Sequence, residues 1–143
     1  MCGNTIWDPL RKKDVALTPE ESVRQWFIRY LNTEMHVPLH LMMSESPLHL
    51  GKKTYRTDIL VYDRQARPLA IVECKRPDVS LDSEVIWQAV RYNMVLNVRY
   101  IIITNGKSTH ICGKRADGNG YAFLDRAPIY EEMLKQDDQD ILK

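Results

Sequence analysis

Hydrophobic residues recur every three or four positions across residues 19–33, the spacing that lines one face of an α-helix. The start of this helix is also marked. Thr18 is a good N-cap, Pro19 suits the first helical position, and Glu21 follows the cap by three residues. The pattern therefore predicts an amphipathic helix over about 19–33. Its apolar positions are Val23, Trp26, Phe27, Tyr30 and Leu31.

Short apolar runs separated by turn residues come next, as is typical of strands. Pro47 and Gly51 mark a loop or short hairpin over 44–53, and Pro77 ends a strand because proline has no N–H to donate to the ladder. Three consecutive isoleucines at 101–103 indicate a strand that is buried on both faces. The predicted strands are 37–43, 55–63, 69–75, 99–104, 110–114 and 121–124.

A second helix is predicted over about 82–97, with Val85, Ala89, Tyr92 and Leu96 on its inner face. The elements thus run helix, strands, helix, strand and hairpin. This order predicts a mixed α/β domain built around one sheet.

The same pattern divides the chain into three parts. Residues 1–17 read as an irregular N-terminal arm, from which Trp7 and Leu10 are expected to dock on the domain. Residues 18–127 form the α/β domain, and 128–143 form a C-terminal helix and a frayed tail, QDDQD and its neighbours. A chain of 143 residues is long enough for one domain with a real core and too short for two.

Composition is ordinary for a soluble globular protein, with 44% hydrophobic and 27% charged residues. No apolar stretch approaches the roughly 20 residues needed to span a bilayer, and the first residues lack the apolar core of a signal peptide. We therefore expect a cytoplasmic protein without a membrane partner.

Cysteine and histidine usage argues against two common kinds of site. The odd set Cys2, Cys74 and Cys112 has no paired spacing, which argues against a disulfide framework, and there is no Cys-x-x-Cys pair to hold zinc. The four histidines show no metal-binding spacing on a predicted helix. A net charge of +1 does not by itself favour nucleic acid. Local basic clusters do occur, at 11–13, at 52–53 with Arg56, and at 114–115.

Two acidic residues on neighbouring predicted strands form the main candidate site. If residues 64–67 make the turn, Asp63 lies opposite Pro68, and the same register places Asp58 opposite Glu73. Directly opposed residues of an antiparallel pair have β-carbons about 4.5–5.5 Å apart. A register slip of one residue would separate the two carboxylates, so the prediction depends on this hairpin.

The residue types in this cluster suit a divalent cation. Glu73 and Lys75 are two residues apart on one strand and therefore project from one face. Two close carboxylates repel, and bound Mg²⁺ or Mn²⁺ would relieve that repulsion. The Cys74 backbone carbonyl could complete the metal shell, while Lys75 would place positive charge beside the attacking hydroxide or a phosphate.

A simpler interpretation is a surface hairpin in which Glu73 and Lys75 form a structural salt bridge. A Glu-x-Lys pair alone is a weak signal. However, Glu73 and Lys75 end the apolar run that begins at Leu69, and Asp58 precedes the apolar run 59–62. Charges that enter a core are costly unless they are paired or coordinate something, which favours a functional role.

These motifs together resemble the PD-(D/E)xK nuclease superfamily, and specifically the N-terminal nuclease domain of type I restriction enzyme R subunits. The resemblance implies a restriction-endonuclease-like core, a central mixed sheet flanked by helices. The position before Asp58 is Thr57, where the superfamily pattern has proline. The matching stretches are PEESVRQ at 19–25, TDILVYD at 57–63, VECKRP at 72–77, QAVRY at 88–92 and TNG at 104–106.

The resemblance also implies residue roles. Asp58 and Glu73 would be metal ligands and Lys75 the catalytic lysine, while Gln88 and Tyr92 match a Gln-x-x-x-Tyr motif of related nucleases. A glutamate of the first helix would assist the metal or its water.

Helical projection favours Glu20 as that glutamate over Glu21. Glu20 is three residues before Val23 and borders the buried face, whereas Glu21 sits at the capping position.

The favoured hypothesis is a metal-dependent endonuclease that acts on DNA, with Mg²⁺ or Mn²⁺ as cofactor. No Gly-x-x-x-x-Gly-Lys-Ser/Thr loop occurs, so any ATP-driven motor or specificity subunit of a restriction system would be a partner. One alternative is a non-catalytic scaffold that binds nucleic acid or protein and keeps the nuclease fold. Another is a phosphodiesterase acting on small nucleotides. The sequence does not decide whether the substrate is DNA or RNA, whether one or two metal ions act, or what the oligomeric state is.

Overall fold

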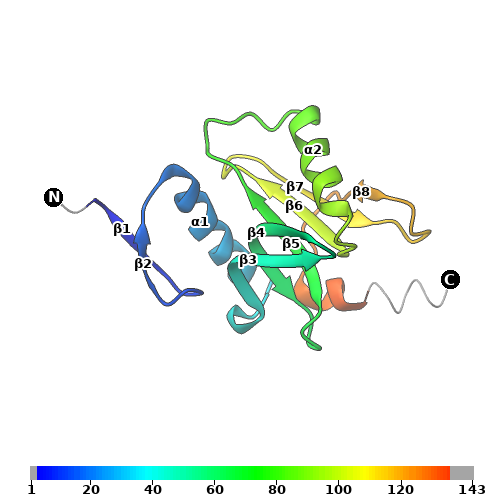
Figure 1. The fold of residues 1–143 in the computed structure, drawn as a ribbon, viewed down its shortest axis with the longest axis horizontal. Coiled ribbons are helices and arrows are strands. Elements are labelled where there is room, and N and C mark those ends of the chain that lie inside the picture. Colours follow the sequence, from blue (N-terminus) through cyan, green and yellow to red (C-terminus); the bar gives the residue numbers. More distant parts are fainter. Residues whose placement is uncertain (1–2, 136–143) are drawn as a thin grey trace.

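A six-stranded sheet in the order β3-β4-β5-β6-β7-β8 forms the centre of the computed structural model, which describes residues 3–135 (Figure 1). β5 and β6 pair in parallel and all other neighbours pair antiparallel, so the sheet is mixed as predicted. The strands are β3 (Met42–Leu50), β4 (Lys53–Tyr62), β5 (Pro68–Cys74), β6 (Tyr100–Thr104), β7 (Thr109–Lys114) and β8 (Tyr121–Phe123).

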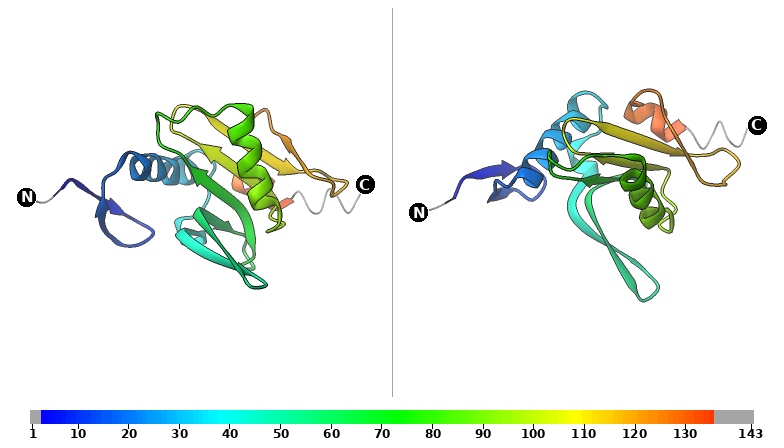
Figure 2. Two further views of the ribbon diagram at one scale, coloured as in Figure 1. Left: turned by 45° about the horizontal axis from the view of Figure 1, so that its top comes forward. Right: turned by 90° about the horizontal axis from the view of Figure 1, so that it is seen from above.

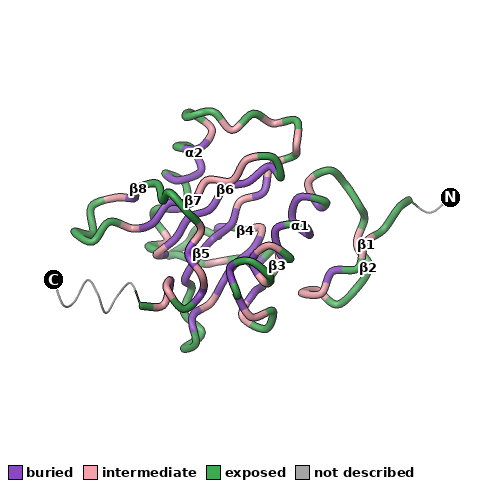
Figure 3. Tube along the Cα trace, turned by 180° about the vertical axis from the view of Figure 1, so that it is seen from behind, coloured by how far each residue is buried: buried purple, intermediate pink, exposed green. Residues whose placement is uncertain are grey.

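Two helices, α1 (Pro19–Thr33) and α2 (Ser83–Met94), pack against opposite faces of this sheet. Val72 of β5 belongs to the core cluster that contains Phe27 of α1, while its neighbour Ile71 belongs to the cluster that contains Ile86 of α2. Alternate residues of a strand point to opposite faces, so β4, β5, β6 and β7 each contribute to both clusters. Figure 3 shows the buried residues concentrated along the central strands.

This two-sided packing explains the isoleucine run. All five residues of β6 are buried, with Ile102 in the α1-side cluster and Ile101 and Ile103 in the α2-side cluster. The prediction of a strand covered on both faces is confirmed.

The predicted bounds and cap of the first helix are also confirmed. The Thr18 hydroxyl accepts a hydrogen bond from the Glu21 N–H at 3.0 Å, and Pro19 begins the helix. The Glu21 carboxylate, however, is bound by the side chains of Arg11, Arg24 and Gln25. Its side chain therefore serves an ion-pair cluster.

The N-terminal arm is a hairpin, and the prediction of an irregular segment is wrong. β1 (Thr5–Asp8) pairs with β2 (Lys13–Ala16), and the buried Asp8 carboxylate accepts the Leu10 N–H at 2.9 Å within the turn. Leu10 packs against the α1-side core as expected. Trp7 is 56% exposed and does not dock.

The third strand begins later and runs further than its pattern predicts. Residues 39–41 form a short 3₁₀ helix, η1 (Leu39–Leu41), in place of the predicted strand 37–43. The segment 44–53, predicted as a loop or short hairpin, is a hairpin in which residues 44–50 continue β3 despite Pro47. β3 is the edge of the sheet, where a proline removes no ladder hydrogen bond that the fold needs.

α2 is shorter than the predicted 82–97, and its buried face is rotated. Asp82 caps its start by accepting the Val85 N–H, and Asn97, at a φ of 55°, lies beyond its end. The buried residues are Ile86, Ala89, Val90 and Asn93. The predicted inner-face residue Tyr92 is 45% exposed, whereas Val85 and Leu96 of the same predicted face pack against the α2-side core.

The chain after β8 returns to the α1 face. Residues 130–135 are helical, as predicted for the segment after Pro128, and Tyr130 and Met133 complete the α1-side core. The predicted frayed tail QDDQD lies outside the described residues. Within residues 3–135, no helix has the length and apolar character needed to cross a membrane.

Candidate active site

The β4–β5 register agrees with the prediction where it matters for the site. Ile59 pairs with Val72, and the next two pairs follow in the same register. The predicted pairing of Asp63 with Pro68 is wrong, because Tyr62 lies opposite Pro68. A β-bulge between Val61 and Tyr62 absorbs this difference of one residue, so the inner pairs keep the predicted alignment.

Asp63 explains why the turn is longer than expected. Its carboxylate accepts the N–H groups of Gln65 and Arg67, each at 2.9 Å, and the Arg67 guanidinium at 2.9 Å. These three bonds hold the pKa of Asp63 below its ordinary value despite the opposing effect of burial. The turn therefore begins at Asp63 itself.

Asp58 and Glu73 directly follow the Ile59–Val72 pair on β4 and β5, where the β4–β5 ladder ends. Leu60 and Ile71, two residues away on each strand, both belong to the α2-side core. The two-residue period of β5 therefore puts Glu73 on the α2 side of the sheet, whereas the Asp58 carboxylate contacts Arg24 of α1.

The two strands separate at this point, and the Asp58 carboxylate fills the gap. Its Oδ2 accepts the Cys74 N–H at 2.6 Å, in place of a backbone partner on β4. Thr57, the next residue, is instead paired with Ser46 of β3. Its hydroxyl donates to the Ser46 carbonyl at 3.1 Å. Thr57, the departure from the superfamily pattern, is thus buried within the β3–β4 pair.

Glu73 and Lys75 line a surface groove of about 370 Å³. The Lys75 ammonium lies 3.0 Å from Glu73 Oε2, and both side chains are partly exposed. Gln88 and Tyr92 of α2 line the same groove, so the structure brings Gln88 beside the Glu-x-Lys pair. The groove is polar on the strand side and flanked by an aromatic ring on the helix side.

A buried arginine on the first helix contacts Asp58 from the other side. The Arg24 side chain is 5% exposed, and its Nη2 lies 3.4 Å from Asp58 Oδ1 and 3.8 Å from Glu20 Oε1. Its Nη1 lies 2.9 Å from Glu21 and 3.4 Å from Glu45. Arg24 thus joins the first helix, β3 and β4 through four carboxylates.

Arg11, from the turn of the N-terminal hairpin, extends this cluster. It pairs with Asp8, binds both oxygens of Glu21 at 2.9 and 2.8 Å, and lies 3.4 Å from Glu45. Among residues 3–135, the ion pairs of Arg11 and Arg24 involve five carboxylates. Five negative charges against two positive ones leave a formal excess of three negative charges.

The two first-helix glutamates therefore differ in environment. Glu21 is buried, and its carboxylate is saturated by Arg11, Arg24 and Gln25. The Glu20 side chain is 45% exposed and shares one guanidinium nitrogen with Asp58. Glu20 thus keeps a carboxylate available near Asp58.

Sequence reasoning missed Arg24, Arg11 and Glu45. A signal for Arg24 was present, since it follows Val23 and precedes Phe27 and Leu31 by three and seven residues, which places a cation on the apolar face of the helix. No such signal exists for Arg11 and Glu45, because their contacts depend on a hairpin and a strand that are distant in sequence.

Burial raises the pKa of Asp58 above its ordinary value. The Cys74 N–H and the Arg24 guanidinium oppose this shift, while the negative charges of Glu20 and Glu73 add to it. The ionised form of Asp58 is therefore less favourable in the folded protein than in the unfolded chain. A bound cation at this position would reverse that preference.

We expect Asp58→Asn to stabilise the protein at neutral pH, because the amide oxygen can still accept the Cys74 N–H while the buried charge is removed. The advantage over the native chain should shrink as pH falls through the raised pKa of Asp58, and vanish below its unfolded value of 3.8. Urea unfolding of both proteins between pH 3.5 and 8 measures this difference. A variant less stable than the native chain at neutral pH, or a difference independent of pH, would contradict the account.

The donor set at this site suits a hard divalent cation. In an extended strand the N–H and C=O of one residue point to the same side, so the Cys74 carbonyl is directed toward the Asp58 side of β5. Burial, followed by the charge of Asp58, raises the pKa of the Cys74 thiol well above its ordinary value, which leaves oxygen atoms as the candidate ligands. Within residues 3–135, no three His, Cys, Asp or Glu side chains converge to hold an ion by themselves. Two carboxylates with a carbonyl and water would be a typical magnesium shell.

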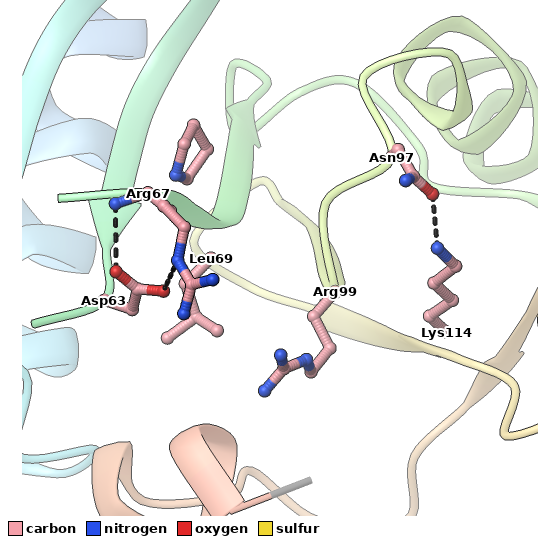
Figure 4. A pocket seen from close by; sticks show the side chains of 7 residues that line it. Asp63, Arg67, Leu69, Asn97, Arg99 and Lys114 are labelled. Atoms are coloured by element: carbon pink, nitrogen blue, oxygen red, sulfur yellow. Dashed lines mark hydrogen bonds and ion pairs between the residues drawn. The ribbon is translucent and has the colours of Figure 1, made fainter. Parts of the chain in front are cut away.

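A second pocket, of about 390 Å³, lies at the opposite end of β5 (Figure 4). Asp63, Arg67, Arg99 and Lys114 line it, with Asp63 bound to Arg67 and Lys114 bound to Asn97. None of the predicted site residues lines this pocket, so it is separate from the Glu73–Lys75 groove.

The mixed sheet and its two flanking helices form the fold of a restriction-enzyme-like nuclease domain. The family model for the N terminus of the type I restriction enzyme R protein (HSDR_N) matches residues 19–128. The chain therefore belongs to this family, as its motifs predicted. No curated protein gives a significant match to the sequence.

Solved structures support the fold. A fragment assigned to an HsdR subunit of a type I restriction enzyme from Vibrio vulnificus YJ016 is 21% identical, with a TM-score of 0.58 over 87% of this chain. This chain spans only 26% of that structure.

Two further structures are more distant. A protein from Anabaena variabilis ATCC 29413, assigned as a nuclease of DUF820, is 10% identical over 80% of this chain and 74% of its own, with a TM-score of 0.49. The DrdV–DNA complex is 18% identical over 82% of this chain and 12% of its own, with a TM-score of 0.46.

Proposed function

We propose that the protein is a metal-dependent endonuclease that hydrolyses DNA phosphodiester bonds. The observation that carries the proposal is the Asp58 carboxylate bound to the Cys74 N–H, the residue between Glu73 and Lys75, with the Glu73–Lys75 pair lining an open groove. Membership of the restriction enzyme family supports the same chemistry. The acid excess around Arg24 favours a cation in this region over a bare anionic substrate.

Each residue has a proposed role in that reaction. Asp58 and Glu73, with the Cys74 carbonyl, would hold Mg²⁺ or Mn²⁺, which when bound lowers the pKa of a ligated water and neutralises charge on a phosphate. Lys75 would place its ammonium beside the hydroxide or the scissile phosphate, where negative charge grows in the transition state.

The helices would support this arrangement. Gln88, in the groove, would orient Lys75 or donate to the nucleic-acid backbone. Arg24 and the Cys74 N–H hold the two oxygens of Asp58 and so fix the orientation of its carboxylate. Glu20 would assist the metal or its water from the N-terminal end of the first helix.

A restriction system would require further components. Because the chain spans about a quarter of the Vibrio structure, we propose that motor and specificity functions reside outside residues 1–143 and that DNA is the shared partner.

The experiment that tests this function is cleavage of supercoiled plasmid by the purified protein with Mg²⁺ or Mn²⁺, compared with EDTA. Lys75→Met should lower turnover by about 100-fold or more, as expected for a lost electrostatic contact to the transition state, yet retain Mn²⁺ affinity in calorimetry. Lys13→Met, at an exposed site on β2, serves as the matched control. Native turnover by Lys75→Met at saturating metal would show that the lysine role is wrong.

A non-catalytic scaffold is the second candidate, and one observation favours it. Glu73 and Lys75 already neutralise each other at 3.0 Å, as a purely structural salt bridge would. A scaffold should show no heat of Mn²⁺ binding that depends on Glu73, and no plasmid cleavage in any metal. The nuclease proposal requires that Glu73-dependent Mn²⁺ binding and plasmid cleavage are both observed.

A further inference from the structure

The outer part of the β3–β4 hairpin carries positive charge and no negative charge. We call residues 46–57 the hairpin tip; it contains Lys52, Lys53 and Arg56 and no Asp or Glu. All three cations are exposed, and the segment projects from the sheet as a two-stranded ribbon (Figure 2). A turn at Gly51, with a φ of 62°, closes the ribbon.

The ribbon is held beside the candidate active site by aromatic contacts. Tyr55 of the hairpin tip packs on Tyr92 of α2, with ring centroids 5.1 Å apart. Tyr92 in turn lines the groove that contains Glu73 and Lys75. On the outer side, the Lys53 ammonium lies 5.2 Å from the Tyr55 ring centroid. A continuous path of contacts thus joins a basic side chain to the groove.

A local backbone feature at Glu45 turns the hairpin tip toward α2. Glu45 has a φ of 51°, in the left-handed region, and it interrupts the β3–β4 pairing opposite Asp58. Inside this point Ile59 packs toward α1, whereas beyond it Tyr55 packs toward α2, although both have odd positions on β4. The hairpin therefore twists across the sheet at the level of the site.

We propose that the hairpin tip binds the sugar-phosphate backbone of a DNA duplex whose scissile strand lies in the Glu73–Lys75 groove. The inference rests on the proposed function, since it names the form of DNA that this site accepts. A two-stranded ribbon fits a duplex groove, and the absence of acidic residues suits phosphate contact. The net charge of the chain is only +1, so duplex binding requires a local concentration of basic residues such as the hairpin tip.

The test is fluorescence anisotropy of a 30-base-pair labelled duplex in EDTA, from 50 to 200 mM salt. The variant Lys52→Gln/Lys53→Gln/Arg56→Gln removes the charges of the hairpin tip. If each contacts one phosphate, the salt slope falls by about 2.7, so the affinity of the native chain decreases about 40-fold more than that of the variant over this range. The matched control is Arg29→Gln/Arg115→Gln/Arg126→Gln, which removes the same charge from exposed sites away from the hairpin.

Two further measurements keep the test decisive. The charge-preserving variant Lys52→Arg/Lys53→Arg/Arg56→Lys should keep the native slope, and thermal melting checks that every variant is folded. Equal losses in the hairpin and control variants, or native affinity only for single-stranded DNA, would overturn the inference. Lack of duplex binding by the native chain would also overturn the inference, even if an acidic protein were found to bind the hairpin tip. Because EDTA prevents cleavage, failure here leaves the nuclease proposal standing, and failure of cleavage leaves this result standing.

Discussion

Glu73→Gln should lower the rate of metal-dependent DNA cleavage by about 1,000-fold or more. Glutamine keeps the size of the side chain but removes the charge that, with Asp58, would hold a divalent ion. Losing a metal ligand removes several kcal/mol of transition-state stabilisation, and about 4 kcal/mol corresponds to that factor in rate. Binding of Mn²⁺ measured by calorimetry should decrease in parallel.

The fold of this variant should be almost unchanged, because the Glu73 side chain is 24% exposed and loses one exposed pair with Lys75. Glu34→Gln, at the far end of the first helix from Glu20, removes the same charge away from the site and should cleave at the native rate. Native cleavage by Glu73→Gln would remove the proposed mechanism. Cleavage lost together with the thermal transition would instead indicate a structural role for Glu73.

The β4–β5 register next to Asp58 and Glu73 could be predicted because it depends on local chain features. A short turn and two apolar runs determine which residues of a hairpin oppose each other. The turn itself was predicted one residue too short, since nothing in the pattern reveals that Asp63 would bind three donors. A bulge corrected the register, so the predicted alignment holds as far as the Ile59–Val72 pair next to the two acidic residues.

The electrostatic surroundings of that pair could not be predicted in the same way. Arg11 lies 13 residues before Arg24 and Glu45 lies 21 residues after it, so the three side chains meet only through the tertiary fold. The extent of β3 was missed for a related reason, because Pro47 stops a central strand but not an edge strand. Edge position is a property of the sheet, so the sequence of one segment cannot reveal it.

Arg24→Met should destabilise the protein by about 3 kcal/mol, a large part of the 5–15 kcal/mol typical of a small domain. The substitution keeps the volume of the aliphatic chain but leaves Asp58 and Glu21 without their buried counter-charge. Arg11 and Gln25 still bind Glu21, which limits the loss. Urea unfolding measures the change. Arg29→Met, on the exposed side of the same helix, should alter stability by no more than about 0.5 kcal/mol.

The same variant tests whether Arg24 balances the charge that a metal would otherwise balance. Removing the guanidinium raises the acid excess around Asp58, so Mn²⁺ should increase the melting temperature of Arg24→Met more than that of the native chain. Adding Asp58→Asn to Arg24→Met should recover part of the lost stability and abolish the extra effect of Mn²⁺. Equal Mn²⁺ effects in both proteins would mean that Arg24 and the cation act on separate sets of carboxylates. In that case Arg24 would stabilise the junction of α1 with β3 and β4 without tuning the candidate metal site.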